Sequence, residues 1–300
     1  MRFRVSLFLL LFLLLLLCCA MGVWADEQLA VVTPEWVTAR TNDPNVRILD
    51  VRADPHEYFA GHVPNAVHMA DNMVRGPREG VPVQYFPPAL LGDLFTRAGV
   101  RKGQTVVVYS DGANVLGATM VAYVLEKIGV PHTAIVDGGW SVFKQAQPTS
   151  QQYPTYRPER LPVQENRTIS VDLAQVKAAI GKPAITFVDA RPYAAYAGEV
   201  KTWMRNGHIP GAINVDWHQL MDPNNPHLFK SVAAMQAIFN AKGVKKTDNI
   251  ILYCGTSREA SLEFMVMRHL LGYPNVRLYE GSWTEYSAHP ELPMETGGPK

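Results

Sequence analysis

Short apolar runs alternate with helical patterns over most of the chain. The helical patterns are clearest over residues 115–128 and 260–271, where apolar positions recur every three or four residues. Uninterrupted apolar runs of this length are typical of strands that are buried on both faces of a parallel sheet. The predicted fold class is therefore α/β, with mainly parallel sheets flanked by helices. The clearest apolar runs lie at 48–49, 106–108, 187–188 and 250–252.

The whole pattern occurs twice. The first copy has Asp-Val-Arg at 50–52, Gly-His-Val-Pro-Asn-Ala at 61–66, then Tyr109 and Trp140. The second copy has Asp-Ala-Arg at 189–191, Gly-His-Ile-Pro-Gly-Ala at 207–212, then Tyr253 and Trp283. The tyrosine and the tryptophan are 31 positions apart in the first copy and 30 apart in the second. Ordered matches at such similar spacing predict two domains of one fold.

The polar stretches set the expected boundaries. A Pro-containing polar stretch between the copies reads as a linker at 148–167. The domains then cover 26–147 and 168–290, and 291–300 reads as a polar tail. Gly129 and Gly272 each follow a helical run, where a glycine commonly ends a helix.

The first 25 residues have the pattern of a secretory signal. Arg2 and Arg4 precede an almost continuous Leu and Phe stretch, and Val23-Trp24-Ala25 offers a cleavage site after Ala25. We therefore expect an exported, periplasmic protein, with an uncleaved anchor as the alternative. An extracellular destination is also compatible with the signal.

Cleavage would change the charge and the cysteine count. The net charge would pass from +1 to −1, and one of the three cysteines, Cys254, would remain. A nearly neutral chain gives no electrostatic reason to expect nucleic acid or an anionic membrane as partner. The nine histidines show no ligand spacing, so no metal site is predicted.

Cys254 follows the apolar run at 250–252 and precedes the helical pattern that begins at Ala260. A thiol that faces the N–H groups of a helix N-terminus has a lowered pKa and is a good nucleophile. Cys254 is therefore predicted to be a thiolate near neutral pH. The alternative for a lone cysteine is a buried and inert thiol.

The copies differ in two places. Alignment of Tyr109 with Tyr253 places Ser110 opposite Cys254, so the first copy lacks the thiol. The second copy also carries seven additional residues around 199–206, which include Lys201, Trp203 and Arg205.

These motifs resemble those of tandem-domain rhodanese sulfurtransferases over roughly residues 30–290. The resemblance implies a catalytically silent first domain and a sulfur-binding loop in the second. It also implies a Cys254 persulfide, formed from a donor such as thiosulfate or 3-mercaptopyruvate and discharged to cyanide or a thiol, without a cofactor. The implied loop is Cys254, Gly255, Thr256, Ser257, Arg258 and Glu259.

The loop departs from the pattern of thiosulfate-type members, which carry a basic residue at the position of Thr256 and an arginine at that of Ala195. Gly255 and Thr256 are closer to mercaptopyruvate-type loops, but Ser257 replaces their usual glycine. Glu259 should repel an anion, and pairing with Arg258 would neutralise it. The candidate residues for binding a donor anion are Arg191, Lys201, Arg205 and Arg258.

Two other functional classes share features with this pattern. Cysteine phosphatases need a larger loop with an arginine six positions after the cysteine, and Ala260 stands there. A non-catalytic sulfur carrier or partner-binding module fits the sequence as well as an enzyme does. Because both copies contain them, the Asp–Arg pairs and His62 and His208 are interpreted as structural, and Trp140 and Trp283 as core residues.

Overall fold

The computed structural model describes residues 30–111, 115–225 and 227–298. The proposed signal peptide lies outside the described residues, so export remains a prediction. Among the described helices, none is long and apolar enough to cross a membrane.

The first copy forms a five-stranded parallel sheet with helices around it and an added antiparallel hairpin, β4–β5. Its elements are β1 (Val31–Val32), α2 (Pro34–Thr38), β2 (Val46–Asp50), α3 (Pro55–Ala60), β3 (Val67–His68), η1 (Asp71–Val74), β4 (Arg75–Arg78), β5 (Val81–Tyr85), α4 (Pro88–Arg97), β6 (Thr105–Tyr109), α5 (Leu116–Lys127), β7 (Thr133–Val136) and α6 (Gly139–Ala146).

The second copy forms another five-stranded parallel sheet. Its elements are η2 (Arg167–Ile169), β8 (Ser170–Val171), α7 (Leu173–Ala179), β9 (Ile185–Asp189), α8 (Tyr193–Tyr196), β10 (Ile213–Asn214), η3 (Trp217–Leu220), α9 (Val232–Ala241), β11 (Asn249–Tyr253), α10 (Arg258–Met265), the π-helical turn η4 (Val266–Leu270), β12 (Val276–Tyr279) and α11 (Ser282–Tyr286).

The two sheets have one topology. The strand order is β3-β2-β6-β7-β1 in the first and β10-β9-β11-β12-β8 in the second, and every neighbouring pair is parallel. The predicted fold class is thus confirmed. Gly129 and Gly272 adopt positive φ, as expected for residues that end helical segments.

The repeated motifs form the same buried network of hydrogen bonds and ion pairs, called the frame, in each domain. In the first domain Arg52 pairs with the buried Asp50, and in the second Arg191 pairs with the buried Asp189, each at 2.5 Å. Each guanidinium also donates to the carbonyl of the motif glycine, Gly61 or Gly207. This arrangement confirms the structural interpretation of the Asp–Arg pairs.

The motif histidines and tryptophans are also structural. His62 and His208 are buried and stack on tyrosines at 3.8 and 3.7 Å between ring centroids. Each Nδ1 atom lies 2.9 Å from the carbonyl oxygen of the same tyrosine. Trp140 and Trp283 are buried beneath the arginines of the two frames.

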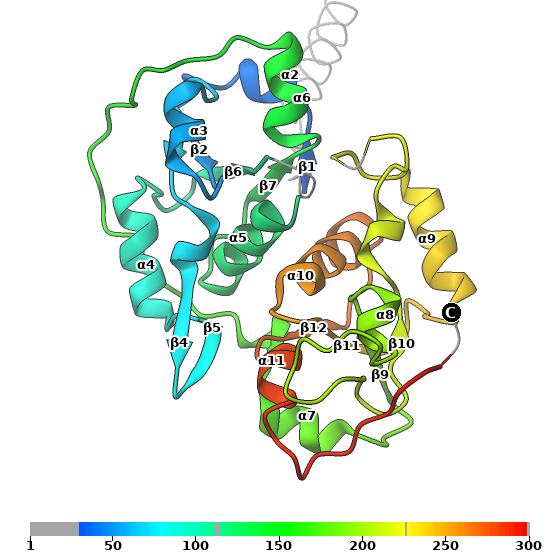
Figure 1. Cartoon of the computed structure of the whole chain (residues 1–300). Coiled ribbons are helices and arrows are strands. Elements are labelled where there is room, and N and C mark those ends of the chain that lie inside the picture. The colour runs from blue at the N-terminus through cyan, green and yellow to red at the C-terminus, as the bar shows by residue number, and fades with distance from the viewer. Residues whose placement is uncertain (1–29, 112–114, 226, 299–300) are drawn as a thin grey trace, which may run out of the picture.

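The domains meet along α5 and α10, which lie side by side between the two sheets (Figure 1). The hydroxyls of Thr119 and Ser261 are 3.1 Å apart, and the Tyr123 ring meets Phe264 edge to face. A 2.5 Å ion pair between Lys127 and Glu280 also crosses the interface. The N-terminal end of α10, where the cysteine loop lies, is thereby held against the first domain.

The linker and the tail are both fixed to the domains. The linker has little regular structure and follows the first domain, to which Tyr156 donates at the Arg97 carbonyl. The predicted tail packs on the second domain as far as Gly298, whose carbonyl accepts from Tyr193. Leu292 is buried there.

Candidate active site

The cysteine loop joins the end of β11 to the start of α10. Apolar residues bury β11 in the centre of its sheet, which leaves Cys254 at the carboxyl edge with no exposed surface. Ser257 turns the chain into α10 with a φ of 66°, a conformation that non-glycine residues rarely adopt. Its hydroxyl donates to the Glu280 carbonyl, so a neighbouring loop supports this conformation.

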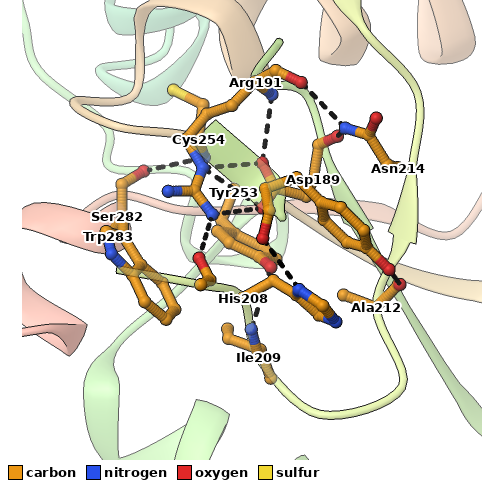
Figure 2. A network of polar contacts seen from close by, with 12 residues as sticks. Asp189, Arg191, His208, Ile209, Ala212, Asn214, Tyr253, Cys254, Ser282 and Trp283 are labelled. Atoms are coloured by element: carbon orange, nitrogen blue, oxygen red, sulfur yellow. Dashed lines mark hydrogen bonds and ion pairs between the residues drawn. The ribbon is translucent and has the colours of Figure 1, made fainter. Parts of the chain in front are cut away.

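The segment 280–284, to which Glu280 belongs, also supports the start of the cysteine loop. The N–H of Trp283 donates to the Cys254 carbonyl at 2.8 Å, and the Thr284 hydroxyl donates to the Gly255 carbonyl at 2.7 Å. The Cys254 N–H donates to the Ser282 hydroxyl at 3.4 Å (Figure 2). The Glu-Gly-Ser-Trp motif therefore holds the loop in shape. In the first domain, the Trp140 N–H donates to the Ser110 carbonyl in the same way.

The backbone N–H groups of Thr256 and Ala260 act to lower the pKa of the Cys254 thiol, as the sequence predicted for a helix start. The expected lowering of its pKa is wrong, however. Burial raises the pKa of Cys254 well above its ordinary value, and the neighbouring Glu259 carboxylate raises it further. The two N–H groups lower the pKa by less than these effects raise it. The raised pKa favours the protonated thiol near neutral pH.

The first domain contributes charged side chains to the loop. Arg258 pairs with Asp71 of η1 at 2.7 Å, and Arg75 at the start of β4 donates through Nη1 to the Thr256 carbonyl at 2.9 Å. The pairing of Arg258 with Glu259 that the sequence suggested is therefore wrong, because Asp71 of the first domain pairs with the guanidinium.

The other predicted anion-binding residues have partners of their own. Lys201 is exposed and donates to the Gly198 carbonyl at 2.7 Å. Arg205 donates to the carbonyls of Tyr286, Ser287 and Leu292, and so fixes the insertion to the end of α11 (Ser282–Tyr286) and the segment that follows it.

Arg191 is the predicted anion-binding residue that lies in the frame beneath the site. It lies between Asp189 and Trp283 (Figure 2), and its Nη1 atom is buried without a hydrogen-bond partner. Burial acts to lower the pKa of Arg191, but the Asp189 carboxylate and, by less, Cys254 raise it.

Trp203 brings the insertion onto the cysteine loop. A Cβ atom added to Gly255 would lie 2.8 Å from the Trp203 ring, so only glycine fits beneath the indole. The seven additional residues of the second copy therefore cover the loop with an aromatic side chain.

The comparisons with known proteins agree with this geometry. A model of the rhodanese-like domain matches residues 33–146 and again residues 172–289. The chain belongs to the rhodanese family. Relatives named as sulfurtransferases, one of them 48% identical, show that the chain is a sulfurtransferase.

Three relatives of this rhodanese are informative. A putative thiosulfate sulfurtransferase from Synechococcus elongatus is 48% identical over 89% of this chain and 85% of its own length. The sulfur carrier protein TtuD from Thermus thermophilus is 29% identical over 89% of this chain and 96% of its own. The crystal structure of SseA from Escherichia coli, described as a 3-mercaptopyruvate sulfotransferase, aligns with a TM-score of 0.77 at 26% identity over 85% of this chain and 99% of its own.

Three residues of this rhodanese site were not predicted from the sequence. Asp71 and Arg75 belong to the copy without the thiol, and nothing in the repeat places them at the loop of the other copy. Trp203 was noted as part of the insertion, without a role.

Glu263, one turn after Glu259 on α10, is fully buried, and neither of its carboxylate oxygens has a hydrogen-bond partner among the described residues. Burial raises its pKa well above the ordinary value, and the nearby carboxylates Asp189, Asp216 and Glu259 raise it further. Glu263 is therefore a neutral acid in the folded rhodanese.

The substitution Glu263→Gln is expected to remove a dependence of stability on pH. Folded wild-type protein keeps a proton that the unfolded chain releases above about pH 4.5, so wild-type stability is greatest below that pH and falls as pH rises toward the raised pKa. The unfolding free energy of the variant, relative to wild type, should increase by about 1.4 kcal/mol per pH unit. Urea unfolding at about pH 5.5 and pH 7.5 measures this, and a constant difference would contradict a neutral Glu263.

Proposed function

We propose that the protein transfers a sulfane sulfur from a small anionic donor to a thiophilic acceptor through a Cys254 persulfide. The observation that carries the proposal is the position of Cys254, which is buried between the end of β11 and the start of α10, where the N–H groups of Thr256 and Ala260 act to lower its pKa. The same position in the first domain is Ser110. A terminal persulfide sulfur, which carries negative charge, would be stabilised by the same kind of N–H groups.

The proposed reaction has two steps. With thiosulfate as donor, the Cys254 thiolate attacks the outer sulfur, the sulfur–sulfur bond of the donor breaks, and sulfite leaves with the bonding electrons. Cyanide or a thiolate then attacks the terminal sulfur of the persulfide and releases the Cys254 thiolate. Thiosulfate and 3-mercaptopyruvate are both proposed as donors, since relatives carry both names.

Arg75 is proposed to bind the anionic part of the donor. It donates to the Thr256 carbonyl of the loop, and it interacts electrostatically with Cys254. Arg258 is proposed as a second contact, although the ion pair with Asp71 occupies part of its guanidinium.

Replacement of Arg75 by Gln is expected to raise the KM for the donor about tenfold, because a hydrogen bond to a charged group contributes about 1.5–3 kcal/mol. The matched control is Arg78→Gln, which removes an exposed arginine from the same hairpin and should leave the KM unchanged. Equal KM values for the two variants in a steady-state thiocyanate assay would remove Arg75 from the proposed donor site.

The alternative is a sulfur carrier that holds the persulfide for a partner, and the similarity to TtuD favours it. Initial rates over a grid of donor and cyanide concentrations distinguish the two. Parallel double-reciprocal lines are expected from an enzyme that releases one product before the acceptor binds. Persulfide formation without turnover for either donor would favour the carrier.

A further inference from the structure

An ion pair connects the cysteine loop to the domain that lacks the thiol. Nη2 of Arg258, in the loop, lies 2.7 Å from Oδ2 of Asp71, in η1 of the first domain. The Asp71 side chain is 5% exposed and that of Arg258 is 25% exposed. The pair is therefore largely shielded from water and from salt, while part of the Arg258 side chain stays accessible to a solute.

The position of the Asp71 carboxylate is set by its packing against α5. A Cβ atom added to Gly117, the second residue of that helix, would lie 2.7 Å from Oδ2 of Asp71, so only glycine leaves room for the carboxylate. The N-terminus of a helix also favours a negative charge nearby. The other oxygen, Oδ1, is buried and has no hydrogen-bond partner within the described residues. The ion pair with Arg258 is thus the contact that compensates the charge of Asp71.

Arg75, the other arginine at the loop, has only neutral partners. Its Nε and Nη2 atoms donate to Oδ1 of Asn72 at 3.0 and 2.8 Å, and its Nη1 atom donates to the Thr256 carbonyl at 2.9 Å. In the part of the chain that the structure describes, Arg75 forms no ion pair. The two arginines therefore differ in kind, because the charge of Arg258 is compensated and that of Arg75 is not.

The nearby charges of the second domain add no further free cation. Glu280 pairs with Lys127 at 2.5 Å, and Asp189 pairs with Arg191 at 2.5 Å. The remaining charged residue of the loop, Glu259, is an acid. A donor that approaches the loop therefore meets one uncompensated positive charge, which matches one negative charge on the donor.

We propose that Asp71 is a specificity-determining residue, which compensates Arg258 and thereby favours donors with one negative charge over donors with two. The inference rests on the proposed sulfur transfer and adds the choice of donor to it. Near neutral pH thiosulfate is a dianion, whereas 3-mercaptopyruvate carries a single carboxylate. Each negative charge on a donor is repelled by Asp71, so the dianion loses about twice as much binding energy as the monoanion does.

The test compares the two donors in the full chain with Asp71→Asn, which removes the charge and keeps the size and an acceptor for Arg258. The ratio of kcat/KM for thiosulfate to kcat/KM for 3-mercaptopyruvate, from thiocyanate production at low salt, should rise about tenfold. The rise should come mainly from a lower KM for thiosulfate and should shrink in about 0.5 M salt. The matched control Glu159→Gln removes the acid that pairs with Arg101 on the linker, and the ratio should stay unchanged.

A second variant distinguishes charge from packing. Arg258→Gln removes the cation of the same pair, so the ratio should fall below that of wild type. The double variant Asp71→Asn with Arg258→Gln restores the net charge of the site, and its ratio should return to within about twofold of the wild-type value. A loss of structure would lower the turnover of both donors together and would leave the ratio constant.

Two results would overturn the role of Asp71. One is an unchanged or lowered ratio in Asp71→Asn, and the other is a shift in the same direction in both single variants, which would indicate packing alone. Either result, obtained while wild type uses both donors, leaves the proposed sulfur transfer intact. A wild-type protein that uses neither donor would instead overturn the proposed function and this inference with it.

Discussion

The substitution Cys254→Ser is expected to lower the turnover of sulfur transfer at least about a thousandfold, because a serine hydroxyl is a far weaker nucleophile and forms no persulfide. The fold should be unchanged, since the loop is held by backbone groups and by the segment 280–284, not by the sulfur. Thiocyanate production from either donor, measured together with circular dichroism, tests this expectation.

The repeat provides the matched control. Ser110 occupies the same strand end in the first domain and receives the same Trp140 N–H bond at its carbonyl. The substitution Ser110→Ala should therefore leave turnover within about twofold of wild type. A Cys254→Ser protein with near-normal turnover would remove the cysteine from the mechanism, and a large loss in Ser110→Ala would show that the first domain is not silent.

Loss of one buried arginine is expected to have the largest effect on stability. Arg191→Met leaves Asp189 without its ion-pair partner in a fully buried position, which should lower the free energy of unfolding by about 3–5 kcal/mol. Arg52→Met creates the same defect beside Asp50 in the first domain and should cost a similar amount. Urea unfolding of both variants tests whether the two frames are equivalent.

The reactivity of the Cys254 thiol should distinguish these two variants. Arg191 interacts electrostatically with Cys254, so Arg191→Met should also slow the alkylation of the thiol by iodoacetamide. Arg52→Met should change only stability. The double variant Asp189→Leu with Arg191→Met removes both charges and should destabilise less than Arg191→Met alone. A cost below about 1 kcal/mol for the single arginine variants would contradict the role of the pairs as buried frames.

The structural role of the Asp–Arg pairs and of the motif histidines could be predicted from the sequence, because both copies contain them. Asp50 and Asp189, with their arginines, occupy equal positions in both copies, and only one of the copies has the thiol. A feature shared by a copy with the thiol and one without it is explained most simply by structure. The buried ion pairs and the stacked histidines confirm that reasoning.

The charges around the thiol could not be predicted in this way. Arg75 and Thr256 are 181 positions apart, and the contact depends on how the two domains pack. The same packing turns Arg258 toward Asp71 and leaves Glu259 beside Cys254. The position after a strand and before a helix correctly indicated N–H donors, but it gave no measure of burial, which dominates the pKa of Cys254.

The most direct test of the account is to detect the sulfur on Cys254. The protein is mixed with thiosulfate or 3-mercaptopyruvate, and its peptides are analysed by mass spectrometry before and after the addition of cyanide. We expect one additional sulfur atom on the peptide that contains Cys254, and its release by cyanide as an equal amount of thiocyanate. Turnover of either donor with no sulfur ever found on Cys254 would contradict the account.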